Sequence, residues 1–312
     1  MLIATANKAY RLREEEGETE PVLVFGGEKI QCLEEGHQIA VLCLAGGEIV
    51  LLEEGRERRL ASGIREDVEC LALLTEKPLH LLLGTAAAHL YRFKEDGQPA
   101  QPLKAFDELE CRGDWYTPWG GPPAVRSLAR SGDWVYADIH VGSIMRSADL
   151  GATWEPVRAE LHEDVHQVAT APALQERVYA NTAAAVFRSE DRGASWQSCS
   201  AGLSARYGRA IAVHPTDPDC LLASVSKGPH QQVEGKLYRS ADAGRSWIHV
   251  TAGFPASTRD NIDTFQLAFS LRGTAWAAVE NTLYKSADRG ASWQAAWKAC
   301  ENIGALACAL AE

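Results

Sequence analysis

The sequence predicts an all-β fold, a seven-bladed β-propeller built from four-stranded antiparallel blades, and three observations lead to it. An eight-residue pattern is repeated four times along the 312 residues. The segments between its copies consist of short β-type runs and show no helical periodicity. The two ends of the chain carry different numbers of strands, which together complete one blade.

The repeated pattern is S-x-D-x-G-x-[ST]-W, which we call the box. Its copies begin at Ser147, Ser189, Ser240 and Ser286, so successive copies start 42, 51 and 46 residues apart. A repeat of about 40 to 50 residues that contains four short strands is typical of propeller blades. In the third unit these strands are GRAIAVHP, CLLASVS, GKLYRS and IHVTAG.

Each residue type in the box suits a tight structural turn. Ser and Asp side chains bond nearby backbone groups, glycine adopts conformations that other residues resist, and tryptophan carries apolar surface between sheets. Identical residues on successive blades occupy equivalent rim positions and do not converge on one substrate, which argues against catalysis or calcium binding by the boxes. The structural residues are Ser147, Asp149, Gly151, Trp154, Ser189, Asp191, Gly193, Trp196, Ser240, Asp242, Gly244, Trp247, Ser286, Asp288, Gly290 and Trp293.

The first half of the chain contains weaker copies of the same unit. HLYRFKEDG (residues 89–97) aligns with KLYRSADAG (residues 236–244), and EIVLLEEG and AYRLREEEGET match less closely. Taking Leu12, Leu51 and Phe93 as equivalents of the box serines gives seven units of about 45 residues. We therefore expect one domain over residues 1–312, with blades at 1–25 plus 302–310, 28–62, 66–105, 123–159, 163–201, 207–252 and 262–298.

The chain ends are expected to close the ring. NIGALACAL, after the last box, is a single strand, whereas LIATAN, KAYRL and VLVF at the start are three. Pairing of the C-terminal strand with the N-terminal strands completes a blade and removes an exposed sheet edge.

The box resembles the repeat of the Asp-box, or BNR-repeat, β-propellers of the sialidase-like superfamily, strongly over about residues 135–295. The resemblance implies that each box is a rim turn between the third and fourth strands of a blade. A sialidase of this kind is six-bladed and carries an Arg-Ile-Pro segment before its first box, and an Asp-box xyloglucanase has two propellers. This chain has no such segment and is long enough for one propeller. A glycosidase, with Asp67, Asp164 and Asp263 as candidate carboxylates, therefore ranks third among the possible functions.

Composition excludes several classes of protein. The net charge of -11 argues against a nucleic-acid partner, and no apolar run approaches the roughly 20 residues that span a membrane. The eight cysteines include no C-x-x-C pair, so neither a zinc ribbon nor a disulfide framework is expected. The first residues lack the features of a signal peptide, and we expect a cytoplasmic location.

Candidate functional residues follow from the geometry of a propeller. If the boxes mark one face, the opposite face, called here the non-box face, collects the ends of second strands and the starts of first strands. Side chains from different blades converge there. The candidate catalytic residues near that face are His140, His166, Asp164, Arg209 and Tyr207. The candidate ligand-binding residues are Trp115, Trp119, Arg126, Asp138, Ser226, Lys227 and Asp263, of which the first three belong to the long loop RGDWYTPWGGPPAVRS, expected to form a binding wall.

Two chemistries are compatible with this set. A histidine oriented by aspartate suits a general base, while an arginine holds an anionic substrate. Alternatively, His140, His166 and His230 bind a transition metal, although no cofactor is assigned. Binding of a small polar or anionic ligand, with or without catalysis, ranks first. A non-catalytic scaffold or assembly factor with a protein partner ranks second.

Overall fold

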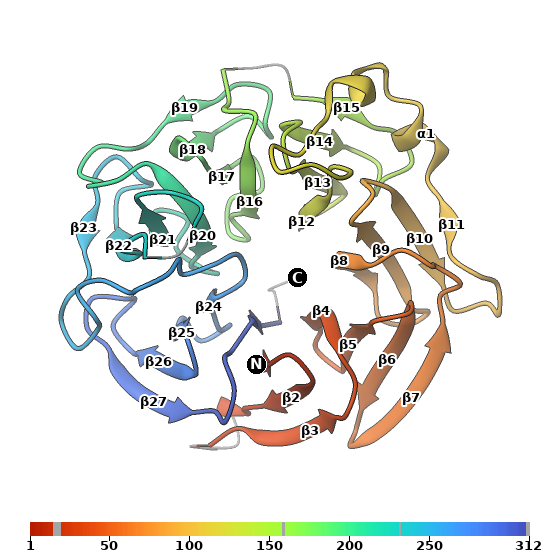
Figure 1. Cartoon of the computed structure of the whole chain (residues 1–312), viewed down its shortest axis with the longest axis horizontal. Coiled ribbons are helices and arrows are strands. Elements are labelled where there is room, and N and C mark those ends of the chain that lie inside the picture. The colour runs from red at the N-terminus through yellow and green to blue at the C-terminus, as the bar shows by residue number, and fades with distance from the viewer. Residues whose placement is uncertain (15–19, 158–159, 231, 310–312) are drawn as a thin grey trace.

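The structure, a computed structural model, describes residues 1–14, 20–157, 160–230 and 232–309. Seven four-stranded sheets stand around a common axis as the blades of a ring (Figure 1), which confirms the predicted seven-bladed β-propeller. Every pair of neighbouring strands within a blade is antiparallel. Residues 15–19, 158–159, 231 and 310, which fall within the expected blade ranges, lie outside the described residues.

Blades 2 to 4 follow the chain without interruption, with the first strand innermost and the fourth outermost. Blade 2 consists of β4 (Ile30–Glu35), β5 (Ile39–Leu44), β6 (Glu48–Glu53) and β7 (Arg56–Ala61). Blade 3 consists of β8 (Val68–Thr75), β9 (His80–Thr85), β10 (Leu90–Lys94) and β11 (Gln101–Pro102). Blade 4 consists of β12 (Val125–Ser131), β13 (Trp134–Ile139), β14 (Ile144–Ser147) and β15 (Glu155–Pro156).

Blades 5 to 7 have the same arrangement. Blade 5 consists of β16 (Val165–Thr170), β17 (Val178–Thr182), β18 (Ala185–Ser189) and β19 (Gln197–Ser198). Blade 6 consists of β20 (Tyr207–Val213), β21 (Leu221–Ser226), β22 (Lys236–Ser240) and β23 (Ile248–His249). Blade 7 consists of β24 (Leu267–Phe269), β25 (Ala275–Val279), β26 (Thr282–Ser286) and β27 (Gln294–Lys298).

Blade 1 is assembled from both ends of the chain, as predicted. The C-terminal strand β28 (Ala305–Ala307) is innermost, followed by β1 (Leu2–Ala4), β2 (Lys8–Arg11) and β3 (Val22–Gly26). β28 runs antiparallel to β1, with Leu2 opposite Ala307 and Ala4 opposite Ala305. Leu306 is buried and its backbone N–H donates to the carbonyl of Phe265, so the closing strand also contacts blade 7.

Apolar residues fill the spaces between blades. Because both faces of a blade pack against its neighbours, second strands are apolar on both sides; all six residues of β5 are buried. The outermost strand β7 (RERRLA) is charged and exposed, which protects its unpaired edge. The only described helices lie between β11 and β12: α1 (Lys104–Asp107) and a 3-10 turn at Glu110–Asp114. Among the described residues, no helix is long and apolar enough to cross a bilayer.

The box turns connect third and fourth strands. In the first box, the Asp149 carboxylate accepts hydrogen bonds from the backbone N–H groups of Ala152 and Thr153 (2.9 and 2.8 Å) and from the Thr153 hydroxyl (2.7 Å). Ser147 Oγ accepts from the N–H of Gly151, a residue with φ of 85° that favours glycine. Partial burial of Asp149 opposes ionisation, but the bonds from Thr153 and Ser147 outweigh it and lower its pKa to about 2. The tryptophan of each box is buried against the preceding blade.

Removing the closing strand tests the ring. Deletion of residues 302–312 should expose the edge of β1 and open the contact between blades 1 and 7. We expect aggregation or a markedly lower melting temperature, measured by size-exclusion chromatography and thermal denaturation. Deletion of residues 310–312 alone, which retains β28, is the control. A monomer with an unchanged melting temperature after the longer deletion would contradict closure by β28.

The boxes are expected to act on stability alone. Asp149→Ala removes the acceptor for four hydrogen bonds, including one from the Ser147 hydroxyl, and should lower the free energy of unfolding by about 1 to 3 kcal/mol. Trp196→Ala opens a cavity between blades 4 and 5 and should cost about 3 to 5 kcal/mol. Gln197→Ala, at an exposed neighbouring position, is the control in urea denaturation. A folded Asp149→Ala protein that selectively loses ligand binding would place a binding site at the boxes.

Candidate functional site

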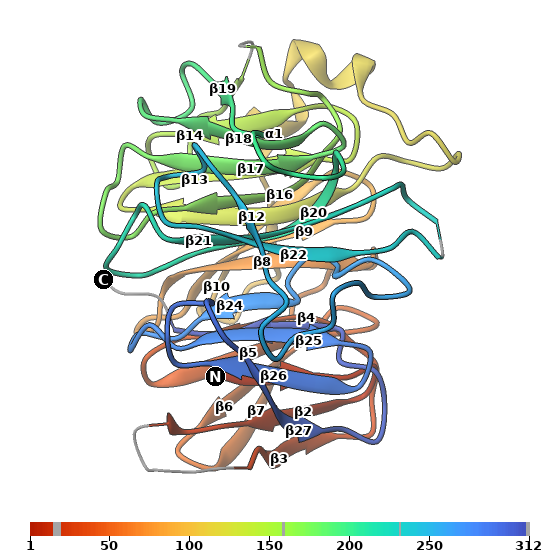
Figure 2. The same ribbon diagram turned by 90° about the vertical axis from the view of Figure 1, so that its left-hand side faces the viewer.

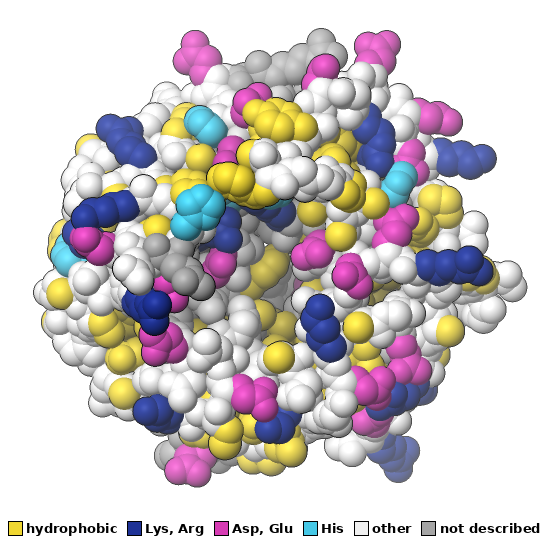
Figure 3. All heavy atoms as spheres, in the orientation of Figure 1, with side chains coloured by type: hydrophobic (Ala, Val, Ile, Leu, Met, Phe, Trp, Pro, Cys, Tyr) yellow, Lys and Arg dark blue, Asp and Glu magenta, His cyan; other side chains and the backbone are white. Residues whose placement is uncertain are grey.

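Polar residues at the inner strands of blades 4 to 7 meet on the non-box face, which faces the viewer in Figures 1 and 3. The centre of the ring is hollowed there, and charged side chains surround the hollow (Figure 3). Arg126 lies on β12, Asp164 directly precedes β16, and Tyr207 and Arg209 lie on β20. Four of the predicted residues thus come from three consecutive blades.

Asp164 is the centre of this cluster. Its Oδ1 lies 3.3 Å from Nη1 of Arg126 and 3.2 Å from Nε2 of His166. The His166 side chain is fully buried, and its Nδ1 contacts the carbonyl oxygen of Gly208 on the next blade. Burial lowers the pKa of His166, against the opposing effect of Asp164. His166 therefore joins two blades beneath the surface and is not open to a ligand.

A second ion pair follows on blades 6 and 7. Arg209 Nε and Nη2 lie 2.8 and 3.0 Å from the two carboxylate oxygens of Asp263. The guanidinium also lies 5.8 Å from the centre of the Tyr207 ring, which is 4.7 Å from that of His166. Because Asp263 holds both ends of the Arg209 fork, this arginine has less capacity for an added anion than the sequence indicated.

His140 lies in the turn between β13 and β14 and is partly exposed. Burial and, next, the charge of Arg126 lower its pKa to about 4, while Asp164 opposes them, so the imidazole is neutral at pH 7. Asp138, two residues earlier, is fully buried and accepts a hydrogen bond from the hydroxyl of Ser127. Its other oxygen has no hydrogen-bond partner in the described part of the chain, and burial raises its pKa to about 7.

Several polar groups around Asp164 have spare bonding capacity. Arg126 uses only Nη1, which donates to Asp164 and to the carbonyl of Val165 at 3.2 Å. Within the described residues, neither the His140 ring nor the Tyr207 hydroxyl makes a hydrogen bond. The pKa of His140 responds to both Arg126 and Asp164, and that of Tyr207 responds to the same two residues. These groups therefore lie near enough for the charges of Arg126 and Asp164 to act on both.

Aromatic side chains stand beside these groups. Trp119 and Tyr116 are 64% and 50% exposed, whereas Trp115, from the same loop, is buried against Phe106 at 5.5 Å. The Trp119 ring lies 5.0 Å from that of His230, in the loop between β21 and β22. Figure 2 shows the segment after β11 and the β21–β22 loop projecting on the same side of the ring. Of the two tryptophans in the loop predicted to form a binding wall, Trp119 is open to a ligand and Trp115 belongs to the core.

The remaining predicted residues are engaged within the protein. Ser226 is buried and donates to the carbonyl of Gly228 at 3.0 Å, and Lys227 pairs with Glu234. His230 contacts Trp119 and lies in a different blade from His140 and His166. The described residues contain no group of three or more His, Cys, Asp or Glu side chains placed to hold a metal ion.

Two features of the structure had no signal in the sequence. Thr264 Oγ1 donates to the carbonyl of His166 at 3.0 Å and ties the loop before β24 to the centre of the ring. In addition, cavities of about 470 and 590 Å³ open on the box face, not on the non-box face. They are lined mainly by turns between first and second strands, whose length and direction depend on the assembled ring.

Comparisons with known proteins find a similarity to one family over part of the chain. Residues 142–261 match the model of the sortilin/Vps10 family, described as sortilin, neurotensin receptor 3. Vacuolar protein sorting/targeting protein 10 of Pyricularia oryzae is 33% identical over 147 residues, which are 46% of this chain and 9% of that protein. The match thus spans less than a tenth of that relative. The range matched by the family model, residues 142–261, contains three of the four boxes.

Solved structures share the fold at low sequence identity. An ancestral GH74 enzyme is 14% identical, with a TM-score of 0.67 over 88% of this chain and 39% of its own. A structure of the mitotic checkpoint complex is 11% identical, with a TM-score of 0.62 over 96% and 83% of the two chains. YCF48 bound to D1 peptide is 15% identical, with a TM-score of 0.59 over 86% and 82%. At these identities the similarity shows the propeller fold alone, which both enzymes and binding proteins use.

The buried Asp138 makes stability depend on pH. Its pKa rises from an ordinary value of 3.8 to about 7 in the folded protein, so folding binds a proton between these values and stability falls as the pH rises through them. Asp138→Asn removes this penalty while keeping an acceptor for Ser127. The variant should exceed the wild type by up to about 4 kcal/mol above pH 7, at about 1.4 kcal/mol per pH unit, and the gain should vanish below pH 4.

Urea denaturation at a series of pH values between 4 and 8 measures this difference. The control is Asp133→Asn, an exposed aspartate in the turn after β12 that should leave the pH profile unchanged. Parallel profiles for Asp138→Asn and the wild type would show that Asp138 is ionised in the folded protein at all these pH values.

Proposed function

We propose that this protein is a non-catalytic recognition propeller that binds an acidic peptide segment of a protein partner on the non-box face. The observation that carries the proposal is the exposed aromatic loop that leads to Arg126, in which Tyr116 pairs with Val141, next to His140, and Trp119 contacts His230. The polar groups of Arg126, His140 and Tyr207 have spare bonding capacity. Aromatic and arginine side chains contribute most of the binding energy at protein interfaces. An acidic side chain suits the free nitrogens of Arg126, and an apolar one suits the indole.

The cluster is a better binding surface than a catalytic centre. A general base must reach the substrate proton, and His166 is fully buried. Arg209, the other cationic candidate, is held by Asp263 through two contacts. YCF48, which has this fold, was solved with a bound D1 peptide, and this agrees with peptide binding by a propeller.

A general-base enzyme is the second candidate, and one observation favours it. His140 is partly exposed and neutral at pH 7, because burial and Arg126 lower its pKa to about 4. A small anionic substrate bound at Arg126 would lie near this base. Loss of turnover in His140→Gln, with ligand binding retained, would support this candidate over a binding protein.

We also infer that the chain is an Asp-box propeller that forms one domain and acts in the cytoplasm. The four boxes share the Ser–Asp hydrogen bond and the bond from the glycine N–H to the serine hydroxyl, which supports a common repeat family. Seven of the cysteines are free thiols, as suits a reducing compartment: Cys32, Cys43, Cys70, Cys199, Cys220, Cys300 and Cys308.

A displayed library of random peptides panned against the purified protein tests the main proposal. We expect enriched peptides that combine an acidic residue with an apolar one. In fluorescence polarisation, Trp119→Ser and Arg126→Met should each lower the affinity for the selected peptide about tenfold or more. Ile248→Ser, which changes an equally exposed apolar residue on the outer strand β23, is the control. Selected peptides that are basic, or that bind Trp119→Ser as tightly as the wild type, would overturn the proposal.

A further inference from the structure

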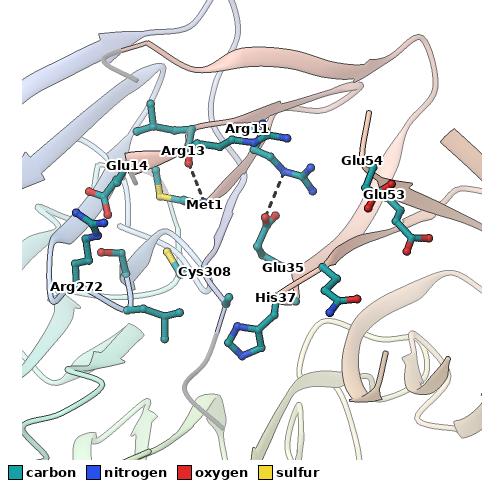
Figure 4. A pocket seen from close by; sticks show the side chains of 16 residues that line it. Met1, Arg11, Arg13, Glu14, Glu35, His37, Glu53, Glu54, Arg272 and Cys308 are labelled. Carbon is teal, nitrogen blue, oxygen red and sulfur yellow. Dashed lines mark hydrogen bonds and ion pairs between the residues drawn. The ribbon is translucent and has the colours of Figure 1, made fainter. Parts of the chain in front are cut away.

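A second site is indicated on the opposite face, where blades 7, 1 and 2 meet. The cavity there has a volume of about 470 Å³, within the usual range for small-molecule sites. Its walls come from the turn between β4 and β5, the end of β2, the turn between β24 and β25, and the residues after β28 (Figure 4). It is independent of the peptide surface proposed above.

Glu35 supplies an acceptor on one side of this cavity. Its side chain is 13% exposed, and its Oε1 lies 3.3 Å from Nε of Arg11, which is 11% exposed. The second carboxylate oxygen, Oε2, is buried and accepts no hydrogen bond from the described residues. Burial raises the pKa of Glu35, while the N-terminal ammonium, Arg11 and Arg13 oppose this effect. The lone pairs of Oε2 nevertheless remain unused, so this oxygen can accept a hydrogen bond from a further donor.

Ser270 provides a second unpartnered oxygen in the same wall. It lies in the turn after β24, and its hydroxyl is buried with no hydrogen bond to the described residues. A buried polar atom without a partner destabilises a protein, whereas a bound ligand or water removes the cost. Two such oxygens beside one cavity indicate a ligand with several N–H donors.

Arg272 places a positive charge at the exposed edge of the cavity, opposite in sign to the Glu35 carboxylate. Its guanidinium makes no hydrogen bond or ion pair with any described residue. Other acidic groups along the wall are already engaged: Glu53 with Lys77 at 2.7 Å, and Glu14 with Lys285 at 3.8 Å. Figure 4 shows Arg272 on one side of the cavity and Glu35 with Arg11 towards the middle. The free cation and the underused carboxylate therefore face the same space from different blades.

We propose that this cavity binds a small amphoteric ligand of the amino-acid type, with its ammonium group at Glu35 and Ser270 and its carboxylate at Arg272. The ligand needs a positive and a negative group because the cavity presents both a carboxylate and a guanidinium. An amine alone leaves Arg272 unpaired, and a carboxylate alone leaves Glu35 and Ser270 unpaired. The described residues hold no cluster suited to a metal ion, so an organic cation fits the acceptors better.

Thermal denaturation with each of the twenty α-amino acids at millimolar concentration provides the first test. We expect at least one amino acid to raise the melting temperature, while ethanolamine and acetate, which carry only one of the two groups, do not. A shift equal to that of the amino acid with ethanolamine alone would overturn the amphoteric assignment. The absence of a shift with all twenty amino acids would overturn the site.

Variants then locate the ligand by calorimetric titration with the amino acid that gives the largest shift. Glu35→Gln and Arg272→Ala should each weaken binding about tenfold or more, as expected for the loss of one charge-assisted hydrogen bond. Arg245→Ala, which removes an exposed arginine from the box of blade 6, is the matched control. Because Glu35→Gln also removes the ion pair with Arg11, folding of this variant is checked first by far-ultraviolet circular dichroism, which should be unchanged. Wild-type affinity in folded Glu35→Gln and Arg272→Ala would overturn the proposal.

Discussion

The pairing of β28 with β1 is the constraint on which the remainder of the ring depends. Every other blade is formed by one continuous stretch of chain, whereas blade 1 joins residues about 300 positions apart. Each blade buries both faces against its neighbours, so an open ring would expose apolar surface on blades 1 and 7. Closure also fixes the direction of all seven first strands, and therefore determines which side chains meet around the axis.

The polar contacts on the non-box face differ from those in the box turns at the rim. Box residues bond within their own turns, whereas Asp164, His166 and Arg126 bond across blades. Most charges near the axis are neutralised by such partners, which keeps buried ions stable. The groups left with spare capacity, His140, Tyr207 and part of Arg126, lie next to the exposed aromatic loop. The proposed binding of a peptide rests on these groups with unused bonding capacity.

The sequence predicted the fold well because each box is a local structure. Its serine, aspartate and glycine interact within eight residues, so spacing alone indicates the turn; the left-handed conformation of Leu150, just before the glycine, was not foreseen. The site was predicted in part. Strand ends placed Asp164 and Arg126 together, but the burial of His166 and Trp115 depends on neighbouring blades and on Phe106. The box-face cavities depend on turns from several blades, and no local pattern encodes them.

The two proposed sites lie on opposite faces of the ring and on different blades: the peptide surface on blades 4 to 6, and the cavity on blades 7, 1 and 2. β4 begins with Ile30 towards the non-box face and reaches the cavity at Glu35, about 17 Å further along the strand. Between these ends the strand is bonded to β5 and packed on β8. Coupling of two sites requires an element with two alternative arrangements, and a close-packed strand bonded along its length has one. Ligands at the two proposed sites are therefore expected to bind without affecting each other.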